Sequence, residues 1–218
     1  MGWFDCLKVP PLPSGPVALE NPVEVDRGKM LSILGPCDVG LTCGHGILGI
    51  AENIYRLKEK EGNNLYTHAF MIYGSGDDPE ITESNWPRVR RGINASMYLG
   101  GNRHTVYARY EELETWQKMG TLSAADTMIQ ARTPYAGGQI LGFLQRVLGM
   151  AVGNKAGVTC IEYVTVLLRG QQVPFCGAQQ SFMTTPTSAF TWLTTGVAKS
   201  LRWKLVAEAV GNKYFVSA

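Results

Sequence analysis

Hydrophobic and polar residues follow two kinds of pattern along the chain: alternation, which predicts strands, and helical spacing, which predicts helices. Alternation over 38–43 is typical of a strand, whereas the apolar and aromatic run over 65–73 is typical of a strand buried on both faces. Gly100-Gly101-Asn102 indicates a hairpin between two further strands. The predicted strands are 38–43, 65–73, 80–84, 94–99 and 105–110, and they indicate an antiparallel sheet in the middle of the chain.

Apolar residues at helical spacing flank this sheet on both sides. The predicted helices are 47–61, 123–132, 140–150, a segment that begins at Cys160, and 188–210, with a further short element at 29–34. A central sheet with helices on both flanks predicts an α+β fold in one domain over 29–218. Proline is too dense in the first 24 residues to allow a helix, so residues 1–28 are expected to form a proline-rich N-terminal arm that precedes regular structure.

The composition is that of a folded, loop-rich globular protein. Of 218 residues, 45% are hydrophobic and only 17% are charged, which excludes a disordered chain. A net charge of +2 without a basic run predicts no nucleic-acid partner. Without a signal peptide or an apolar run of ~20 residues, we expect a cytoplasmic protein that does not insert into membranes, with unconventional export still open. Five cysteines predict reduced thiols, although Cys37 and Cys43 could pair in an oxidising compartment.

Cys160 is the most informative residue of the chain. Thr159 is followed three residues later by Glu162, which is typical of a capping box and puts Cys160 in the first turn of a helix. Unpaired N–H groups and the helix dipole favour the thiolate there, and the thiolate is the nucleophilic form. The alternative is a core cysteine, because Cys160 shares one helical face with Val164 and Leu167.

A catalytic cysteine needs a basic partner, and the chain has three histidines. His68 lies in the predicted strand 65–73, where a rigid scaffold can hold an imidazole within reach of a thiol. His45 lies in a glycine turn and His104 follows the predicted hairpin, so both are expected to face solvent. His68 is therefore the predicted general base, with a buried structural histidine as the alternative.

A third polar group would orient the imidazole and stabilise its charged form. Glu83 ends the strand that returns after the turn at 74–79, so we expect it to lie near His68, with Glu80 and Asp78 as alternatives. The backbone N–H of Cys160 would then be available to stabilise an oxyanion.

Other reactive residues give weaker signals. Cys37, Cys43 and His45 offer three soft ligands, but structural zinc usually takes four, so neither a metal nor a cofactor is expected. The densest basic cluster is expected to be a solvated face and consists of Arg88, Arg90 and Arg91.

Six segments, in order over residues 36–196, resemble motifs of the circularly permuted NlpC-like papain-fold cysteine hydrolases of the YiiX type. They are Asp-Val-Gly-Leu-Thr at 38–42, Thr-His-Ala-Phe-Met-Ile-Tyr at 67–73, Ile-Thr-Glu-Ser at 81–84, Thr-Pro-Tyr at 133–135, Cys-Ile-Glu-Tyr-Val at 160–164 and Thr-Pro-Thr-Ser at 185–188. The resemblance implies a permuted papain-like fold, with a central antiparallel sheet or small barrel flanked by helices. It also implies Cys160 as nucleophile, His68 as base and Glu83 as orienting group.

The resemblance further implies a cysteine peptidase or amidase that cleaves an amide bond, with a peptide, a peptidoglycan fragment or an acyl compound as substrate. Residues 68–73 and 160–165 also resemble motifs of the related lecithin:retinol acyltransferase-like group, so an acyltransferase or thioesterase acting on lipid or acyl esters is the first alternative. The second alternative is a non-catalytic structural or binding protein that keeps the fold.

Overall fold

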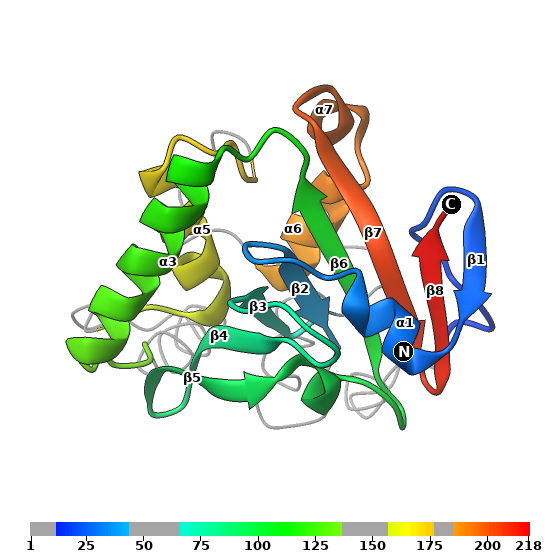
Figure 1. Ribbon diagram of the computed structural model, residues 1–218, viewed down its shortest axis with the longest axis horizontal. Helices are drawn as coiled ribbons and strands as arrows, with labels where there is room; N and C mark the ends of the chain where they lie inside the picture. Colours follow the sequence, from blue (N-terminus) through cyan, green and yellow to red (C-terminus); the bar gives the residue numbers. More distant parts are fainter. Residues whose placement is uncertain (1–11, 44–65, 137–156, 177–184) are drawn as a thin grey trace, which may run out of the picture.

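A computed structural model describes residues 12–43, 66–136, 157–176 and 185–218, and these form a mixed α+β structure around an antiparallel sheet (Figure 1). The eight strands lie in the order β1-β8-β7-β6-β2-β3-β4-β5. Their bounds are β1 Pro22–Val25, β2 Val39–Thr42, β3 His68–Ile72, β4 Glu80–Asn85, β5 Arg88–Asn94, β6 His104–Tyr110, β7 Trp203–Val210 and β8 Lys213–Ser217. The predicted α+β class is confirmed.

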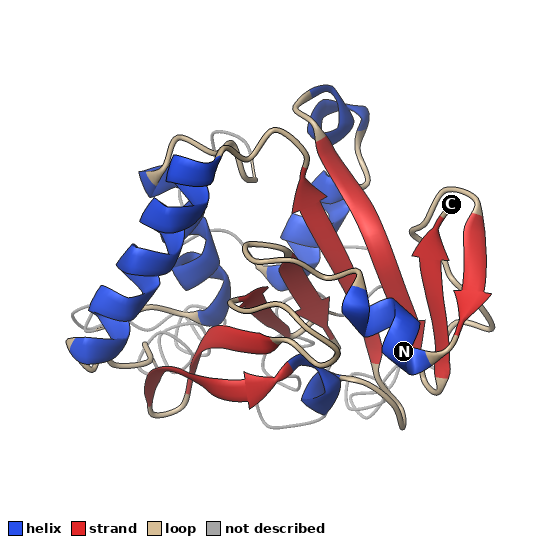
Figure 2. Cartoon of the chain, in the orientation of Figure 1, coloured by secondary structure: helices blue, strands red, loops and turns tan. Residues whose placement is uncertain are grey.

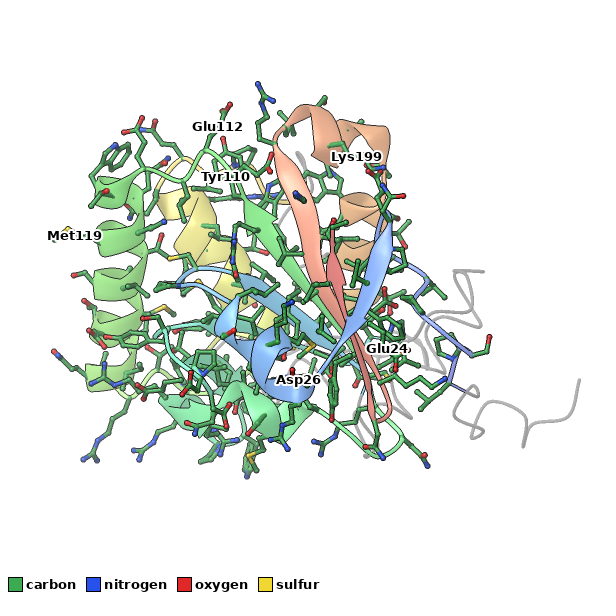
Figure 3. The ribbon with its side chains drawn as sticks, turned by 45° about the vertical axis from the view of Figure 1, so that its right-hand side comes forward. Glu24, Asp26, Tyr110, Glu112, Met119 and Lys199 are labelled. Carbon is green, nitrogen blue, oxygen red and sulfur yellow. The ribbon has the colours of Figure 1, made fainter. Side chains whose placement is uncertain are left out.

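Five α-helices and one 3₁₀-helix in the described ranges accompany the sheet (Figure 2). They are α1 Arg27–Ser32, η2 Ala95–Tyr98, α3 Thr115–Gln130, α5 Cys160–Gly170, α6 Pro186–Leu193 and α7 Gly196–Ser200. The outer face of α3 is open to solvent, and Met119 projects away from the molecule there (Figure 3). None of the described helices is long and apolar enough to cross a membrane.

Two hydrophobic cores lie on opposite faces of the sheet, because successive side chains of a strand point to opposite faces. Ala69 and Met71 of β3 belong to the larger core, which includes the apolar face of α5. Phe70 and Ile72 belong to the smaller core, which includes α1. Strand β3 is therefore buried on both faces, as its continuous apolar run predicted.

Four predicted strands are confirmed as β2, β3, β4 and β6, but the hairpin prediction was wrong. Residues 95–98 of the predicted strand 94–99 form the 3₁₀-helix η2, and the strand before it, β5, was missed. The hairpin joins β4 and β5 instead. Most of β5 is polar and at least partly exposed, so it carries no clear alternation of apolar residues.

The predicted helix at Cys160 is confirmed, whereas two other helix predictions need correction. Helix α3 begins at Thr115 and not near 123, because Gln117 caps the N–H of Glu114 at 3.0 Å. Residues 188–210 divide among α6, α7 and β7. Apolar residues four positions apart share a face in a strand as well as in a helix, so the spacing of Leu201, Leu205 and Ala209 did not distinguish the two.

Residues 22–25, inside the predicted N-terminal arm, form the edge strand β1, which pairs with β8. Regular structure therefore begins before the end of that arm. The division into an arm over 1–28 and a domain over 29–218 stays a prediction. The predicted helices 47–61 and 140–150 lie outside the described residues.

Candidate active site

Cys160 begins helix α5, and the predicted capping box is present. The Thr159 hydroxyl accepts the N–H of Glu162 at 3.3 Å, and the Glu162 carboxylate accepts the N–H of Thr159 at 3.4 Å. N–H groups in the first helical turn have no acceptor within the helix, and they lie at the positive end of its dipole. The Cys160 sulfur therefore lies where negative charge is favoured, although the residue is buried, as the core alternative also requires.

The backbone just before Cys160 is fixed by two neighbouring segments. The carbonyl of Val158 accepts the Ser84 hydroxyl of β4 at 2.7 Å, and the N–H of Val158 donates to the carbonyl of Pro134 at 3.1 Å. Gly157 has a φ of +103°, and a Cβ there would lie 2.2 Å from the Pro134 oxygen. Only glycine fits this approach, so the close packing of two backbones determines where the thiol stands.

His68 is the first residue of β3, and its imidazole lies between Cys160 and Glu83. Its Nε2 is 2.6 Å from the Glu83 carboxylate, and the ring also hydrogen-bonds to the Cys160 side chain. With Nε2 directed at Glu83, the nitrogen left for the thiol is Nδ1. Strands β3 and β4 pair at Met71–Thr82 and Ile72–Ile81, and the His68–Glu83 contact lies just beyond these pairs.

The Glu83 carboxylate is fully buried and accepts hydrogen bonds from several side chains. The Tyr98 hydroxyl donates to one oxygen at 2.5 Å, the same oxygen that His68 contacts. Arg90 contacts the other oxygen through Nε at 2.8 Å and through Nη2 at 2.7 Å. Asn85 adds a longer contact at 3.5 Å. A buried carboxylate with this many donors is held in one orientation and stays ionised.

Electrostatics favour the charged forms of both partners. Burial by itself raises the pKa of Glu83, but the hydrogen bond and charge of His68, with the bonds from Tyr98 and Arg90, outweigh it and lower the pKa to about 2. Burial by itself lowers the pKa of His68, but hydrogen bonds and charge interactions with Cys160 and Glu83 raise it to about 10. At neutral pH the pair is therefore an imidazolium beside a carboxylate.

Aromatic packing holds Tyr98 against this pair. Its ring stacks on Phe70, with centroids 4.6 Å apart and an interplanar angle of 17°, and lies 5.3 Å from the His68 ring. Phe70 in turn covers Gly40 of β2, where a Cβ would be 2.3 Å from the Phe70 ring. A glycine in the centre of the sheet therefore makes room for the ring that supports the site.

The other described cysteines lack such an arrangement. Cys37, Cys43 and Cys176 are free thiols, so the possible Cys37–Cys43 disulfide is absent. Burial raises the pKa of Cys37 and of Cys176 to about 12, and it also raises the pKa of Cys43. These three thiols stay protonated at neutral pH and are poor nucleophiles.

One expectation about charged residues was wrong, and another holds in part. His104 does not face solvent, because only 5% of the residue is exposed and its Nε2 is 2.6 Å from the Glu208 carboxylate. Arg88 and Arg91 are exposed as expected, but Arg90 is only partly exposed and its guanidinium pairs with Glu83. Arg91 pairs with Asp126. His45 lies outside the described residues.

The structure brings Cys160, His68 and Glu83 together and gives the alternative acids other partners. The Asp78 carboxylate accepts the N–H of Ser96 at 3.0 Å. Glu80 pairs with Asn94 through the backbone of the sheet. Sequence reasoning missed Arg90 and Tyr98 at the site. Prediction of the β4–β5 pair would have found Arg90, which lies directly opposite Glu83, but β5 carries no clear alternation, and nothing in the sequence marked Tyr98.

Within the described ranges, no group of three His, Cys, Asp or Glu side chains is arranged to hold a metal ion. No protein-family model and no curated protein sequence matches the chain. In three dimensions it is similar to the crystal structure of the metalloprotein yiiX from Escherichia coli O157:H7, with a TM-score of 0.43 and 14% sequence identity. The alignment covers 81% of this chain and 98% of that one. The likeness is loose, and nothing about activity follows from it.

Proposed function

We propose that the protein is a cysteine hydrolase that cleaves amide bonds, with Cys160 as nucleophile, His68 as general acid and base, and Glu83 as orienting group. The contact from the Cys160 thiol through the His68 ring to the Glu83 carboxylate carries the proposal. A nucleophile, a base and a group that holds the base are the parts that acyl transfer requires.

The reaction would proceed in two acyl-transfer steps. The Cys160 thiolate attacks the carbonyl carbon, and N–H groups of the first turn of α5 stabilise the oxyanion. The tetrahedral intermediate collapses as His68 protonates the leaving amine, which leaves a thioester on Cys160. His68 then takes a proton from water, the resulting hydroxide attacks the thioester, and the acid is released with the thiolate restored. Glu83 keeps the imidazole oriented and stabilises its charged form throughout.

Peptides are the proposed substrates, including the peptides of peptidoglycan, and this choice rests on the motif resemblance at 67–73 and 160–164. The steps above apply equally to an ester or thioester carbonyl. Hydrolysis of peptide and acyl-ester libraries, with Cys160→Ala as the inactive control, distinguishes the two substrate classes. If wild type turns over acyl esters faster than peptides, the proposed amidase would be replaced by an enzyme that acts on acyl esters.

Alkylation of Cys160 by iodoacetamide tests the catalytic pair directly. The rate is measured against pH by mass spectrometry in wild type and in His68→Ala, with Cys43 of the same molecules as internal control. We expect wild-type Cys160 to react at pH 6, where a free thiol is almost fully protonated, and His68→Ala to lose this low-pH reactivity. Identical Cys160 profiles in the two proteins would contradict the proposal.

A further inference from the structure

Trp86 is the most exposed large hydrophobic side chain among the described residues, with 70% of the residue open to solvent. A single exposed apolar side chain is ordinary on a protein surface. Its position is what matters here. Trp86 lies in the turn between β4 and β5, directly after the strand that carries Glu83.

This turn lies at the end of the sheet where the candidate site is built. Glu83 of β4, whose carboxylate contacts the His68 ring, is three residues before Trp86. Ser84 of the same strand binds the carbonyl of Val158, close before Cys160. Both the base and the nucleophile are thus anchored beside the turn that carries Trp86.

Hydrogen bonds hold the turn in place on both sides of Trp86. The N–H of Trp86 donates to the Asn85 side chain at 2.8 Å, and the carbonyl of Pro87 accepts the N–H of Tyr135 at 3.0 Å. Val89 donates to the carbonyl of Thr133 at 2.9 Å. An aromatic side chain on a fixed turn can contact a ligand without the entropic cost of ordering a loop.

We propose that Trp86 is a specificity-determining residue, which binds an apolar or aromatic side chain on the acyl part of the substrate, next to the bond that Cys160 attacks. This inference rests on the proposed cysteine hydrolase activity. A large aromatic ring that is open to solvent, on a turn directly after the strand that contacts His68 and the backbone before Cys160, favours a substrate that covers it. The substrate class is therefore a peptide with a bulky apolar residue before the scissile amide.

Two chloromethyl ketones that differ only in side chain test the inference, since Cys160 displaces chloride from both and forms a thioether. In wild type, acetyl-phenylalanyl chloromethyl ketone is expected to alkylate Cys160 at least about tenfold faster than the acetyl-glycyl reagent. In Trp86→Ala this ratio is expected to fall close to one, while the rate with iodoacetamide, which has no side chain, stays unchanged. Trp86→Phe should keep most of the preference.

Trp116→Ala is the matched control, because Trp116 is also exposed, at 53%, but lies at the other end of the structure. Its neighbour Gln117 binds the carbonyl of Gln171, just past the C-terminal end of α5, so about 16 Å of helix separates it from Cys160. This variant should keep the wild-type ratio.

Three outcomes would overturn the inference: a wild type without the side-chain preference, a Trp86→Ala protein that keeps it, or equal losses with the ketone and with iodoacetamide. The last would mean that Trp86 supports the site and does not bind substrate. Failure of the proposed function would give a different result. Cys160 of wild type would then react with iodoacetamide no faster than Cys160 of His68→Ala, whatever the effect of Trp86→Ala.

Discussion

His68–Glu83 and His104–Glu208 are two histidine–glutamate pairs in the same sheet, and each is joined through Nε2 at 2.6 Å to a fully buried glutamate. In both pairs the glutamate lies on the strand next to the one that carries the histidine. The two pairs therefore differ mainly in the groups that surround them.

The surroundings differ at both ends of the pair. The free ring nitrogen of His68 is left for Cys160, whereas Nδ1 of His104 lies 3.2 Å from the Tyr66 hydroxyl. Glu83 is held by the side chains of Arg90 and Tyr98. A histidine paired with a buried glutamate is thus a candidate catalyst here only where a nucleophile contacts its ring as well.

Glu208 is held by backbone groups instead: its two oxygens accept the N–H groups of Val17 and Ala18 at 2.9 and 3.0 Å. The second pair therefore fastens the segment before β1 to strand β7. We expect it to contribute to stability and the first pair to contribute to reactivity.

Replacing each glutamate by glutamine should separate the two roles. Glu83→Gln is expected to lower the alkylation rate of Cys160 at neutral pH about 100-fold, because the imidazolium loses its counter-charge and its fixed orientation. Glu208→Gln is expected to lower the free energy of unfolding by about 2 kcal/mol and leave alkylation of the folded protein unchanged. Urea unfolding and iodoacetamide kinetics measure the two effects. Loss of Cys160 reactivity in Glu208→Gln would mean that the second pair also serves the site.

A substitution that shifts only the backbone before Cys160 should affect the reactivity at the His68–Glu83 pair and leave the His104–Glu208 pair unchanged. In Gly157→Ala the new Cβ meets the Pro134 oxygen, so the backbone before Cys160 must shift, and alkylation should fall about tenfold. Gly76→Ala is the control, since Gly76 also has a positive φ, of +126°, but has open space around it. It should cost about 1 kcal/mol of stability and leave the Cys160 rate as in wild type. Equal rates in the two variants would contradict the role given to Gly157.

The two tyrosines that contact the pairs offer a finer test. Tyr98→Phe removes one hydrogen bond from Glu83 and should slow alkylation about fivefold. Tyr66→Phe removes the contact with His104 and should cost about 1 kcal/mol of stability without slowing alkylation. If instead Tyr98→Phe reacts like wild type, Arg90 and Asn85 suffice to hold the carboxylate.

The His68–Glu83 pair should also make the free energy of unfolding depend on pH, and this effect is expected to be smaller than the changes in alkylation rate. The folded pKa of Glu83, about 2, lies below its ordinary 4.5, so its contribution is present above pH 4.5 and is lost as pH falls toward 2. The folded pKa of His68, about 10, lies above 6.5, so its contribution is present below pH 6.5 and is lost as pH rises toward 10. Urea unfolding of wild type and Glu83→Gln should therefore differ most between about pH 4.5 and 6.5. A difference that is as large at about pH 3 and about pH 9 as in this range would contradict the shifts.

Local signals in the sequence predicted the site better than they predicted the edges of the sheet. The capping box at Thr159 and the apolar run around His68 depend on neighbouring residues, so they could be recognised without the fold. Contacts such as Tyr98 with Glu83 depend on a short helix that no pattern marks. The burial of His104 depends on Glu208, which is far along the chain and was predicted to be helical. Long-range pairing of this kind is not encoded in local periodicity.

The strand order has a consequence for the nascent chain. Strand β6 leaves the ribosome long before its neighbour β7, because α3 and α5 lie between them in the sequence. Until residues 203–217 are made, one side of β6 has an open row of backbone hydrogen-bonding groups, and β1 has no partner. A chain that stops before Trp203 would already contain Cys160, His68 and Glu83, yet its unpaired edge would make it prone to aggregate. Protection from aggregation is thus completed by the last two strands, after every residue of the candidate site has been synthesised.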